Sequence, residues 1–263
     1  MKLGYTQVIV LKGRYKMVRI TDSLIIVLSL LLSFGGHAAP QDNLPHIRVC
    51  GDAIDWPPYT YTHNNKALGY DIDVLNEAFT KKGISYEITM TSWSRCLRGT
   101  KNGEFDLALS ASFNEQRNKD YLYTDWYYTI TPHYIYSTKR FPEGLKISNV
   151  QDLAQYNVCG NHGYNYSGFQ LNNIVRVGHS INDCLEKVKQ GECDIYLNWR
   201  EIIHAMKDIW GIDYMSDELV STAVPNMQAT KFYMLISRQL EQRHQLKEYL
   251  DKHLRQIRKR IKI

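Results

Sequence analysis

Short apolar runs alternate with amphipathic segments along most of the chain, and this pattern predicts strands that alternate with helices. Segment 69–83, GYDIDVLNEAFTKKG, is apolar at Ile72, Leu75 and Phe79, the spacing of an amphipathic helix that ends at Gly83. In the first half we expect strands at 47–52, 84–90 and 107–110, with this helix and a short helix carrying Trp93 between them. Strands that alternate with helices imply a parallel sheet.

The carboxyl ends of such strands form the edge at which an open α/β sheet binds its ligand. The paired prolines that follow the first strand exclude a helix and place Trp56 and Tyr59 on a loop at this edge. The segment after Leu109 should lie at the same edge.

An internal repeat relates the two halves of the chain. CLRGTKNGEFDLALS from Cys96 and CLEKVKQGECDIYLN from Cys184 share Cys, Leu, Lys, Gly, Glu, Asp and a later Leu at the same offsets. A strand containing VCG precedes each copy, at Cys50 and at Cys159. Chance similarity is the alternative, because short helix–turn–strand units share Gly and Asp for turn chemistry, but the cysteine match favours a true repeat.

The second copy predicts a helix at 182–190 between strands at 158–160 and 194–198. We therefore expect two similar α/β lobes, with Ser110 and Asn198 facing each other across a cleft.

An apolar run at 24–34, LIIVLSLLLSF, is too short to span a bilayer as a mature helix and follows Arg19. Together with the small residues after it, this run predicts a secretory signal peptide at 1–38. Met17 is an alternative start to Met1, and cleavage after Ala39 is an alternative to cleavage after Ala38.

Removal of this leader changes the charge of the protein. The leader holds five Lys or Arg and one acid, so the mature chain carries about +1 instead of the formal +5. We therefore expect no nucleic-acid partner, and a basic run in the last dozen residues is typical of a solvated helix face. The mature chain has no second apolar stretch long enough to cross a membrane, so we expect a soluble protein outside the cytoplasm.

Five cysteines remain in a compartment that permits disulfides. The repeat favours Cys50 with Cys96 and Cys159 with Cys184, each pair joining a first strand to the following helix. Cys193 is then left as a buried apolar residue, although Cys159 with Cys193 is a rival pairing. We expect no metal and no cofactor, because no Cys and His pair has the spacing of metal ligands.

The stretch 106–128, DLALSASFNEQRNKDYLYTDWYY, carries the chemistry that suits a small anion. A strand ends in two hydroxyl residues, Ser110 and Ser112, and a single Arg117 follows after a turn. A guanidinium binds a carboxylate through two parallel hydrogen bonds that seryl hydroxyls can extend. A solvated surface role for Arg117, beside Glu115 and Asp120, is the alternative.

From Ile47 onward, the chain resembles the periplasmic solute-binding proteins of the polar amino acid type, the extracellular receptors of ABC importers. The segments that carry the resemblance are IRVCGDAIDWPPYTY, LGYDIDVLNEAFTKKG, KNGEFDLALSASFNEQRNKDYLYTDWYY and KQGECDIYL. The resemblance implies an α/β two-lobed clamp in which each lobe is a small, mostly parallel sheet flanked by helices. Two hinge strands, near 129–132 and near Lys231, would join the lobes, with lobe 1 at 41–129 plus 231–263 and lobe 2 at 130–230.

The resemblance also implies roles for individual residues. Arg117 would bind the carboxylate of the ligand with help from Ser110 and Ser112, and Trp93 would lie against the body of the ligand. The remaining predicted ligand-binding residues are Trp56 and Tyr59 as the other wall, and Gly163, Tyr164, Asn165, Asn198 and Trp199 from the second lobe.

One position departs from the family pattern. Amino-acid binders of this type carry an acid after the second-lobe strand to hold the α-ammonium, but here Trp199 stands at that position. A buried ammonium without a carboxylate is costly, so Asp55 or another acid would have to replace it. We therefore expect a small carboxylate, either an amino acid held differently or a related organic acid.

The leading interpretation is a monomeric binding protein that closes on its ligand and presents it to a membrane permease or sensor. The alternative is a secreted enzyme on the same fold, such as a dehydratase of cyclic carboxylates, with His162 as the first candidate for acid–base chemistry and Glu201 as the second.

Overall fold

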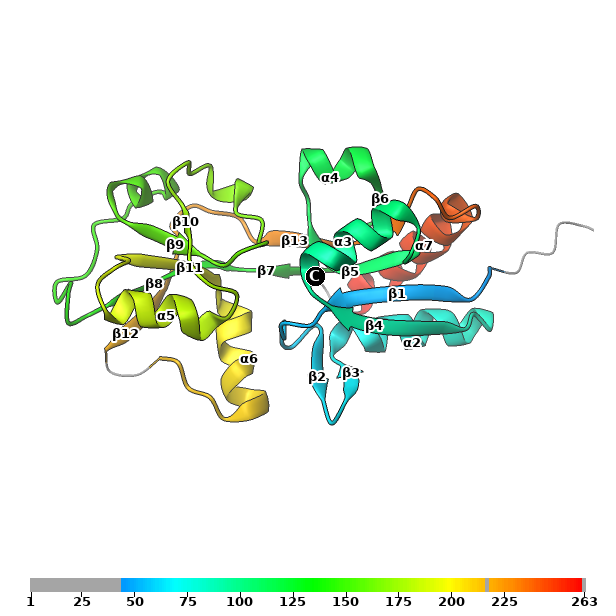
Figure 1. The fold of residues 1–263 in the computed structure, drawn as a ribbon, viewed down its shortest axis with the longest axis horizontal. Helices are drawn as coiled ribbons and strands as arrows, with labels where there is room; N and C mark the ends of the chain where they lie inside the picture. Colours follow the sequence, from blue (N-terminus) through cyan, green and yellow to red (C-terminus); the bar gives the residue numbers. More distant parts are fainter. Residues whose placement is uncertain (1–43, 216–217, 262–263) are drawn as a thin grey trace, which may run out of the picture. The chain divides into compact units, whose positions relative to one another are not determined.

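The computed structural model describes residues 44–215 and 218–261, which form two α/β lobes built on separate sheets (Figure 1). The predicted signal peptide, its two starts and its cleavage sites lie outside the described residues. We define the first lobe by the six-stranded sheet and the second lobe by the five-stranded sheet.

The sheet of the first lobe has the order β4-β1-β5-β13-β6, and β7 also pairs with β13. Its strands are β1 (Ile47–Asp52), β4 (Tyr86–Thr91), β5 (Leu107–Ser112), β6 (Tyr121–Tyr123), β7 (Tyr128–Ile130) and β13 (Thr230–Ser237). Its helices are α2 (Tyr70–Lys82), α3 (Trp93–Asn102), α4 (Glu115–Asp120) and α7 (Arg243–Ile261). A hairpin of β2 (Tyr61–His63) and β3 (Lys66–Leu68) extends from the loop after β1.

The sheet of the second lobe has the order β10-β9-β11-β8-β12. Its strands are β8 (Pro132–Ser137), β9 (Val158–Gly160), β10 (Val175–Arg176), β11 (Ile195–Trp199) and β12 (Leu219–Ala223). Its helices are α5 (Ile181–Lys189), α6 (Arg200–Trp210) and the two 3₁₀ helices Val150–Gln155 and Ser167–Phe169.

Both sheets are mixed, in contrast to the mostly parallel sheets expected from the sequence. The β1–β4 and β1–β5 pairs are parallel, as are β9–β10 and β9–β11. The antiparallel pairs involve β13 and β8. Strands β8 and β13 begin at the crossings between the lobes. Each therefore enters its sheet at the edge where the parallel strands have their carboxyl ends, and it runs antiparallel to its neighbours.

Two paired segments connect the lobes. The chain leaves the first sheet at Ile130 and enters the second at Pro132, and it returns between Ala223 and Thr230. Lys231 pairs with Thr129, so the two crossings meet near the positions predicted as hinges.

The repeat is visible in the backbone of both lobes. The Asp106 carboxylate accepts the backbone N–H of Arg48 at 2.9 Å, and the Asp194 carboxylate accepts that of Asn157 at 2.9 Å. Each aspartate returns its own N–H to the carbonyl of the same residue, at 2.8 and 2.9 Å. Each pair therefore fixes the helix–turn–strand unit to the strand that carries VCG.

The disulfides follow the repeat in the first lobe only. Cys50 is bonded to Cys96 as predicted, but Cys159 is bonded to Cys193, and Cys184 is a buried free thiol. The predicted Cys159–Cys184 pair is therefore wrong. Helix α3 packs on β1, whereas α5 packs mainly on β11 and β8, so Cys184 does not lie over the β9 strand that carries Cys159.

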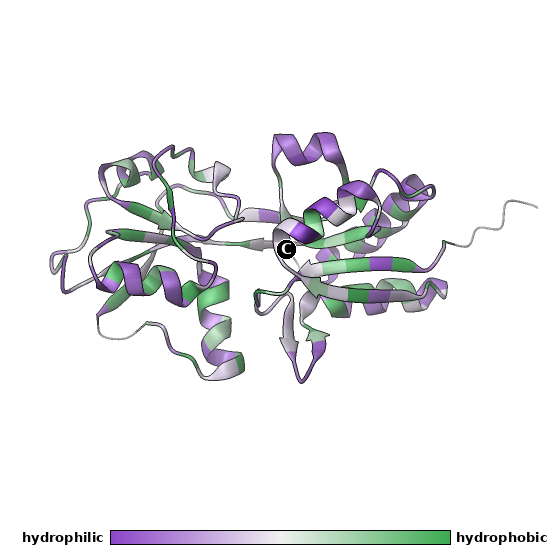
Figure 2. Ribbon diagram, in the orientation of Figure 1, coloured by the Kyte–Doolittle hydropathy of each residue, from purple (hydrophilic) through white to green (hydrophobic). Residues whose placement is uncertain are grey.

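Apolar side chains fill the interior of each lobe. Figure 2 shows β5 as mainly hydrophobic and α4 as hydrophilic, and α4 has no buried residue. Within the described residues, no helix is both long and apolar enough to cross a membrane.

Candidate functional site

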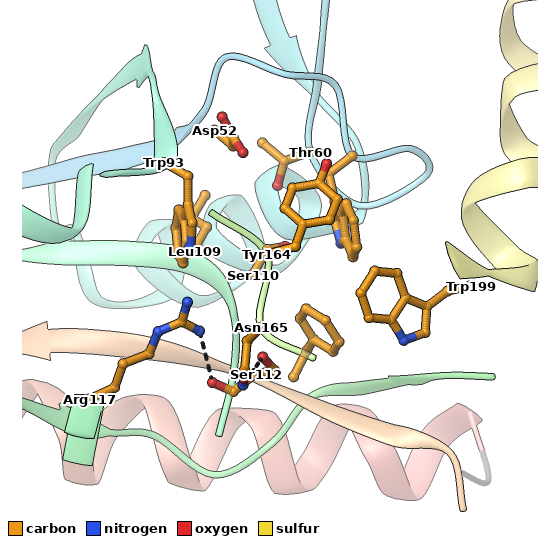
Figure 3. A pocket seen from close by; sticks show the side chains of 12 residues that line it. Asp52, Thr60, Trp93, Leu109, Ser110, Ser112, Arg117, Tyr164, Asn165 and Trp199 are labelled. Atoms are coloured by element: carbon orange, nitrogen blue, oxygen red, sulfur yellow. Dashed lines mark hydrogen bonds between the residues drawn. The ribbon is translucent and has the colours of Figure 1, made fainter. Parts of the chain in front are cut away.

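A cavity lies between the lobes at the carboxyl ends of β1, β5 and β11 (Figure 3). It leaves about 40 Å³ for the centres of water molecules, room for a few waters. The residues that line it are Asp52, Trp56, Thr60, Trp93, Leu109, Ser110, Ser112, Arg117, Tyr164, Asn165, Trp199 and Phe232. In this arrangement of the lobes, an amino-acid-sized molecule fits only if side chains or lobes move apart.

Arg117 extends from the short helix α4 into this cavity. Its Nη1–H group donates a hydrogen bond to the Ser112 carbonyl at 3.2 Å, and the guanidinium lies 5.5 Å from the centroid of the Trp93 ring. Among the described residues, no carboxylate lies within 4.0 Å of it. Burial lowers the pKa of Arg117 because the charge is partly removed from water. Arg117 therefore has unused donors in a partly dry site, which rules out the solvated surface role.

Ser112 is buried at the cavity and bonded to the other lobe. Asn165 Nδ2 donates to Ser112 Oγ at 3.0 Å and to the Phe113 carbonyl at 2.9 Å. Ser112 Oγ accepts this bond and donates its own proton to none of the described residues, so the hydroxyl can still donate to an anion. The two Asn165 bonds hold the lobes together beside Arg117.

Ser110 has a different environment. Its Oγ donates to Asp71 Oδ2 at 2.5 Å and lies 2.8 Å from the hydroxyl of Tyr128, while its backbone N–H donates to Tyr127 Oη at 3.1 Å. Asp71 is fully buried, and burial raises the pKa of its carboxyl to about 6. Since a serine hydroxyl has one proton, Ser110 offers no donor to a ligand while Asp71 is ionised.

Aromatic rings from both lobes form the apolar wall. The ring centroid of Trp56 lies 5.3 Å from that of Trp199, 5.2 Å from that of Tyr164 and 5.7 Å from that of Phe232. Trp199 also stacks on Tyr166 at 5.6 Å. The indole Nε1 of Trp199 is buried without a hydrogen-bond partner among the described residues, so a ligand acceptor or a water can satisfy it.

Asp52 supplies a carboxylate at the end of β1. It accepts the backbone N–H of Ile54 at 3.1 Å. Burial raises the pKa of Asp52 to about 6, although the backbone N–H groups of Ile54 and Trp93 and the nearby His179 act in the opposite direction. Asp52 and Arg117 lie at opposite sides of the cavity, with Trp93 between them (Figure 3).

Three residues predicted for the site do not line the cavity. Tyr59 is buried and stacks on Tyr128, with ring centroids 3.7 Å apart. Gly163 is next to the cavity, and a Cβ added there would meet Trp93 at 3.9 Å. Asn198 is buried, donates to the Tyr196 hydroxyl and accepts the Trp199 N–H, so it does not face Ser110 across the cleft.

The two acid–base candidates also lie outside the cavity. His162 is exposed and contacts His179, with ring centroids 4.9 Å apart. The Glu201 carboxylate accepts the backbone N–H of Thr131 at 2.8 Å and its hydroxyl at 2.9 Å. Glu201 therefore holds the hinge segment between β7 and β8.

Sequence reasoning missed four lining residues: Asp52, Thr60, Leu109 and Phe232. Asp52 could have been found, because it ends the first predicted strand and so lies at the ligand-binding edge. Phe232 could not, because it comes from the returning hinge strand β13.

The donor set of the cavity suits an organic ligand. Among the described residues, no group of three or more His, Cys, Asp or Glu side chains is placed to hold a metal ion. A cation, an anion and an apolar wall are the features that the cavity presents.

Comparisons with known proteins agree with this geometry. A probable amino-acid-binding protein from Bacillus subtilis is 20% identical over 195 residues, which cover 72% of this chain and 71% of that protein. Three further curated relatives match along 51%, 57% and 36% of their own lengths.

Solved structures show the same fold. The arginine-, lysine-, histidine-binding protein of Geobacillus stearothermophilus has a TM-score of 0.64 at 16% identity, covering 82% of this chain and 91% of that one. A histidine kinase sensor domain with similarity to periplasmic binding proteins has a TM-score of 0.65 at 18% identity, covering 84% and 94%. The profile of the bacterial extracellular solute-binding proteins, family 3, matches residues 47–261. The chain therefore belongs to this family, and its two-lobed clamp is a solute-binding fold.

Proposed function

We propose that this protein captures a small amino acid or related carboxylate between its lobes, with Arg117 binding the carboxylate of the ligand. The observation that carries the proposal is the partly desolvated guanidinium, which has no carboxylate partner among the described residues. Ser112 is the best placed hydroxyl to support it, because its proton is not used by a described residue.

Asp52 is the group that we propose for an amine of the ligand. It provides the acid that the second lobe lacks at Trp199, and it lies across the cavity from Arg117. A ligand with a carboxylate at one end and an ammonium at the other would match both charges. The aromatic wall of Trp56, Trp199 and Phe232 would then cover the apolar part of the ligand.

We propose that the ligand enters as the lobes open and is held as they close, because the cavity leaves room for only a few waters in the present arrangement. The Asn165 bonds to Ser112 and Phe113 would form as the lobes close. We propose that the closed monomer is the form presented in the periplasm to a membrane importer or sensor.

Ligand analogues test the two ends separately. A thermal-shift screen of amino acids and organic acids provides a first ligand, since a ligand at ~100 times its Kd adds roughly 2.7 kcal/mol of stability. Calorimetry then compares this ligand with its methyl ester and with its N-acetyl form. We expect the ester to lose binding through Arg117 and the N-acetyl form to lose binding through Asp52. Equal affinity for all three would disprove the recognition of a dipolar ligand.

An enzyme on this fold is the second candidate, and the observation that favours it is the raised pKa of Asp52 at about 6 within the cavity. A carboxyl with such a pKa can act as a general acid near neutral pH. Mass analysis of the ligand after incubation with the protein tests this function. Turnover that is lost in Asp52→Asn, with binding retained, would favour the enzyme over the receptor.

A further inference from the structure

A second hollow opens beside the cavity, and we call it the rim groove. Its wall includes Asn114 and Arg117 from the first lobe and Ser167, Asn172 and Arg176 from the second. It leaves about 520 Å³ for the centres of water molecules, far more than the cavity. Because Arg117 lines both spaces, the groove is the outward continuation of the site.

The charge of the rim groove has one sign. Two arginines line it and no aspartate or glutamate does. Neither Arg117 nor Arg176 lies within 4.0 Å of a carboxylate among the described residues. Two positive charges facing one hollow repel each other, and an anion between them removes this repulsion.

Arg176 is held in position without an acid. Its Nη1 donates to the Asn161 carbonyl at 2.9 Å, and its guanidinium lies 4.6 Å from the centroid of the Tyr166 ring. These contacts fix the plane of the guanidinium and leave its other N–H groups without partners among the described residues. A preoriented guanidinium with unused donors binds oxyanions through paired hydrogen bonds.

Neutral side chains complete the wall. The side-chain amides of Asn114 and Asn172 can donate to an anion, while Leu171 and Ile174 supply an apolar surface. This combination suits an organic anion that has a short hydrocarbon chain between its charged groups.

We propose that the rim groove binds a small multivalent organic anion, of the class of di- and tricarboxylates, between Arg117 and Arg176. Since the two arginines belong to different lobes, such an anion bridges the lobes at the rim and favours the closed arrangement. The anion is a second ligand, and it shares the Arg117 guanidinium with the carboxylate of the ligand proposed for the cavity.

The experiment uses citrate as the probe and acetate as the monovalent control, both at constant ionic strength. Calorimetry should show that citrate binds the parent protein at least tenfold more tightly than acetate, because only citrate carries more than one carboxylate and so offers one to each guanidinium group. Arg176→Ala should weaken citrate binding at least tenfold. Arg98→Ala is the matched control, since Arg98 is an exposed arginine on α3 that does not line the groove. The Kd of this variant for citrate should stay within twofold of the parent value.

A second variant covers the case in which Arg176→Ala alters folding. Asn172→Asp keeps the guanidinium and adds a negative charge to an exposed loop in the groove, so it should also weaken citrate binding about tenfold. Absence of citrate binding to the parent, or equal losses in Arg176→Ala and Arg98→Ala, would overturn the proposal. A citrate affinity that does not change in Asn172→Asp would overturn it as well.

Discussion

Arg117→Ala is the substitution that separates ligand binding from folding most clearly. Charge-assisted hydrogen bonds contribute about 1.5–3 kcal/mol each, and removal of one member of a buried charged pair costs about 2–5 kcal/mol. A loss of about 4 kcal/mol would weaken ligand binding about a thousandfold. Arg117→Lys retains the positive charge but not the planar guanidinium, so it should weaken ligand binding about tenfold.

Folding should respond much less. The substitution removes a 3.2 Å hydrogen bond to the Ser112 carbonyl and a ring contact with Trp93, and it also relieves the desolvation that lowers the pKa of Arg117. These effects oppose each other, so the free energy of unfolding of the unliganded protein should change by about 1 kcal/mol or less, a Tm shift of about 2–4 °C.

Calorimetric titration with the ligand found by screening, together with thermal unfolding in its absence, measures both quantities. Arg98→Ala removes an exposed positive charge elsewhere on the first lobe and should change neither by more than experimental error. A Kd of Arg117→Ala within about threefold of the parent value would refute the reasoning.

Three further predictions concern stability and closure. Burial raises the pKa of Asp52 to about 6 in the folded state, so the folded protein binds more protons than the unfolded chain between about pH 4 and 6, and stability falls as pH rises through this window. Asp52→Asn should therefore raise the free energy of unfolding by about 3 kcal/mol at pH 7 but not at pH 4. Equal gains in thermal unfolding at both pH values would contradict this. Asn165→Ala removes two hydrogen bonds between the lobes, so ligand affinity should fall about tenfold. Small-angle scattering should also show a larger radius of gyration. An unchanged radius of gyration would show that these bonds do not hold the lobes together. Non-reducing peptide mapping should recover Cys159 bonded to Cys193, and Cys193→Ala should lower the free energy of unfolding by about 3–4 kcal/mol. Burial raises the pKa of the Cys184 thiol to about 12, so this thiol should resist alkylation until the protein unfolds. A Cys159–Cys184 peptide would refute the observed pairing.

The elements of the fold could be predicted because they depend on local pattern. Apolar spacing and a terminal glycine predicted a helix over 69–83, and the structure has α2 at Tyr70–Lys82. The repeat predicted a helix at 182–190 and a strand at 194–198, and the structure has Ile181–Lys189 and Ile195–Trp199. The segment with Ser110, Ser112 and Arg117 was also found from sequence, and all three line the cavity.

Side-chain directions in the site were harder to predict. Asn198 and Trp199 are neighbours on β11, so they point to opposite faces, and the cavity receives Trp199. On β5, Leu109 and Ser110 both reach the cavity, because Ser110 has a φ of 55° that interrupts the alternation. Pattern alone does not reveal such a residue.

By itself, the sequence determined the secondary structure, the two related lobes and the presence of an arginine beside hydroxyl residues, because these follow from periodicity and from short motifs. The tertiary structure decided how those groups are used. Asp71 on α2 accepts the hydrogen bond of the Ser110 hydroxyl, Asn165 in the second lobe donates to Ser112, and the position of α5 leaves Cys184 unpaired. Each of these outcomes depends on which segments, distant in the chain, come within hydrogen-bonding or bonding distance, and packing alone sets those distances.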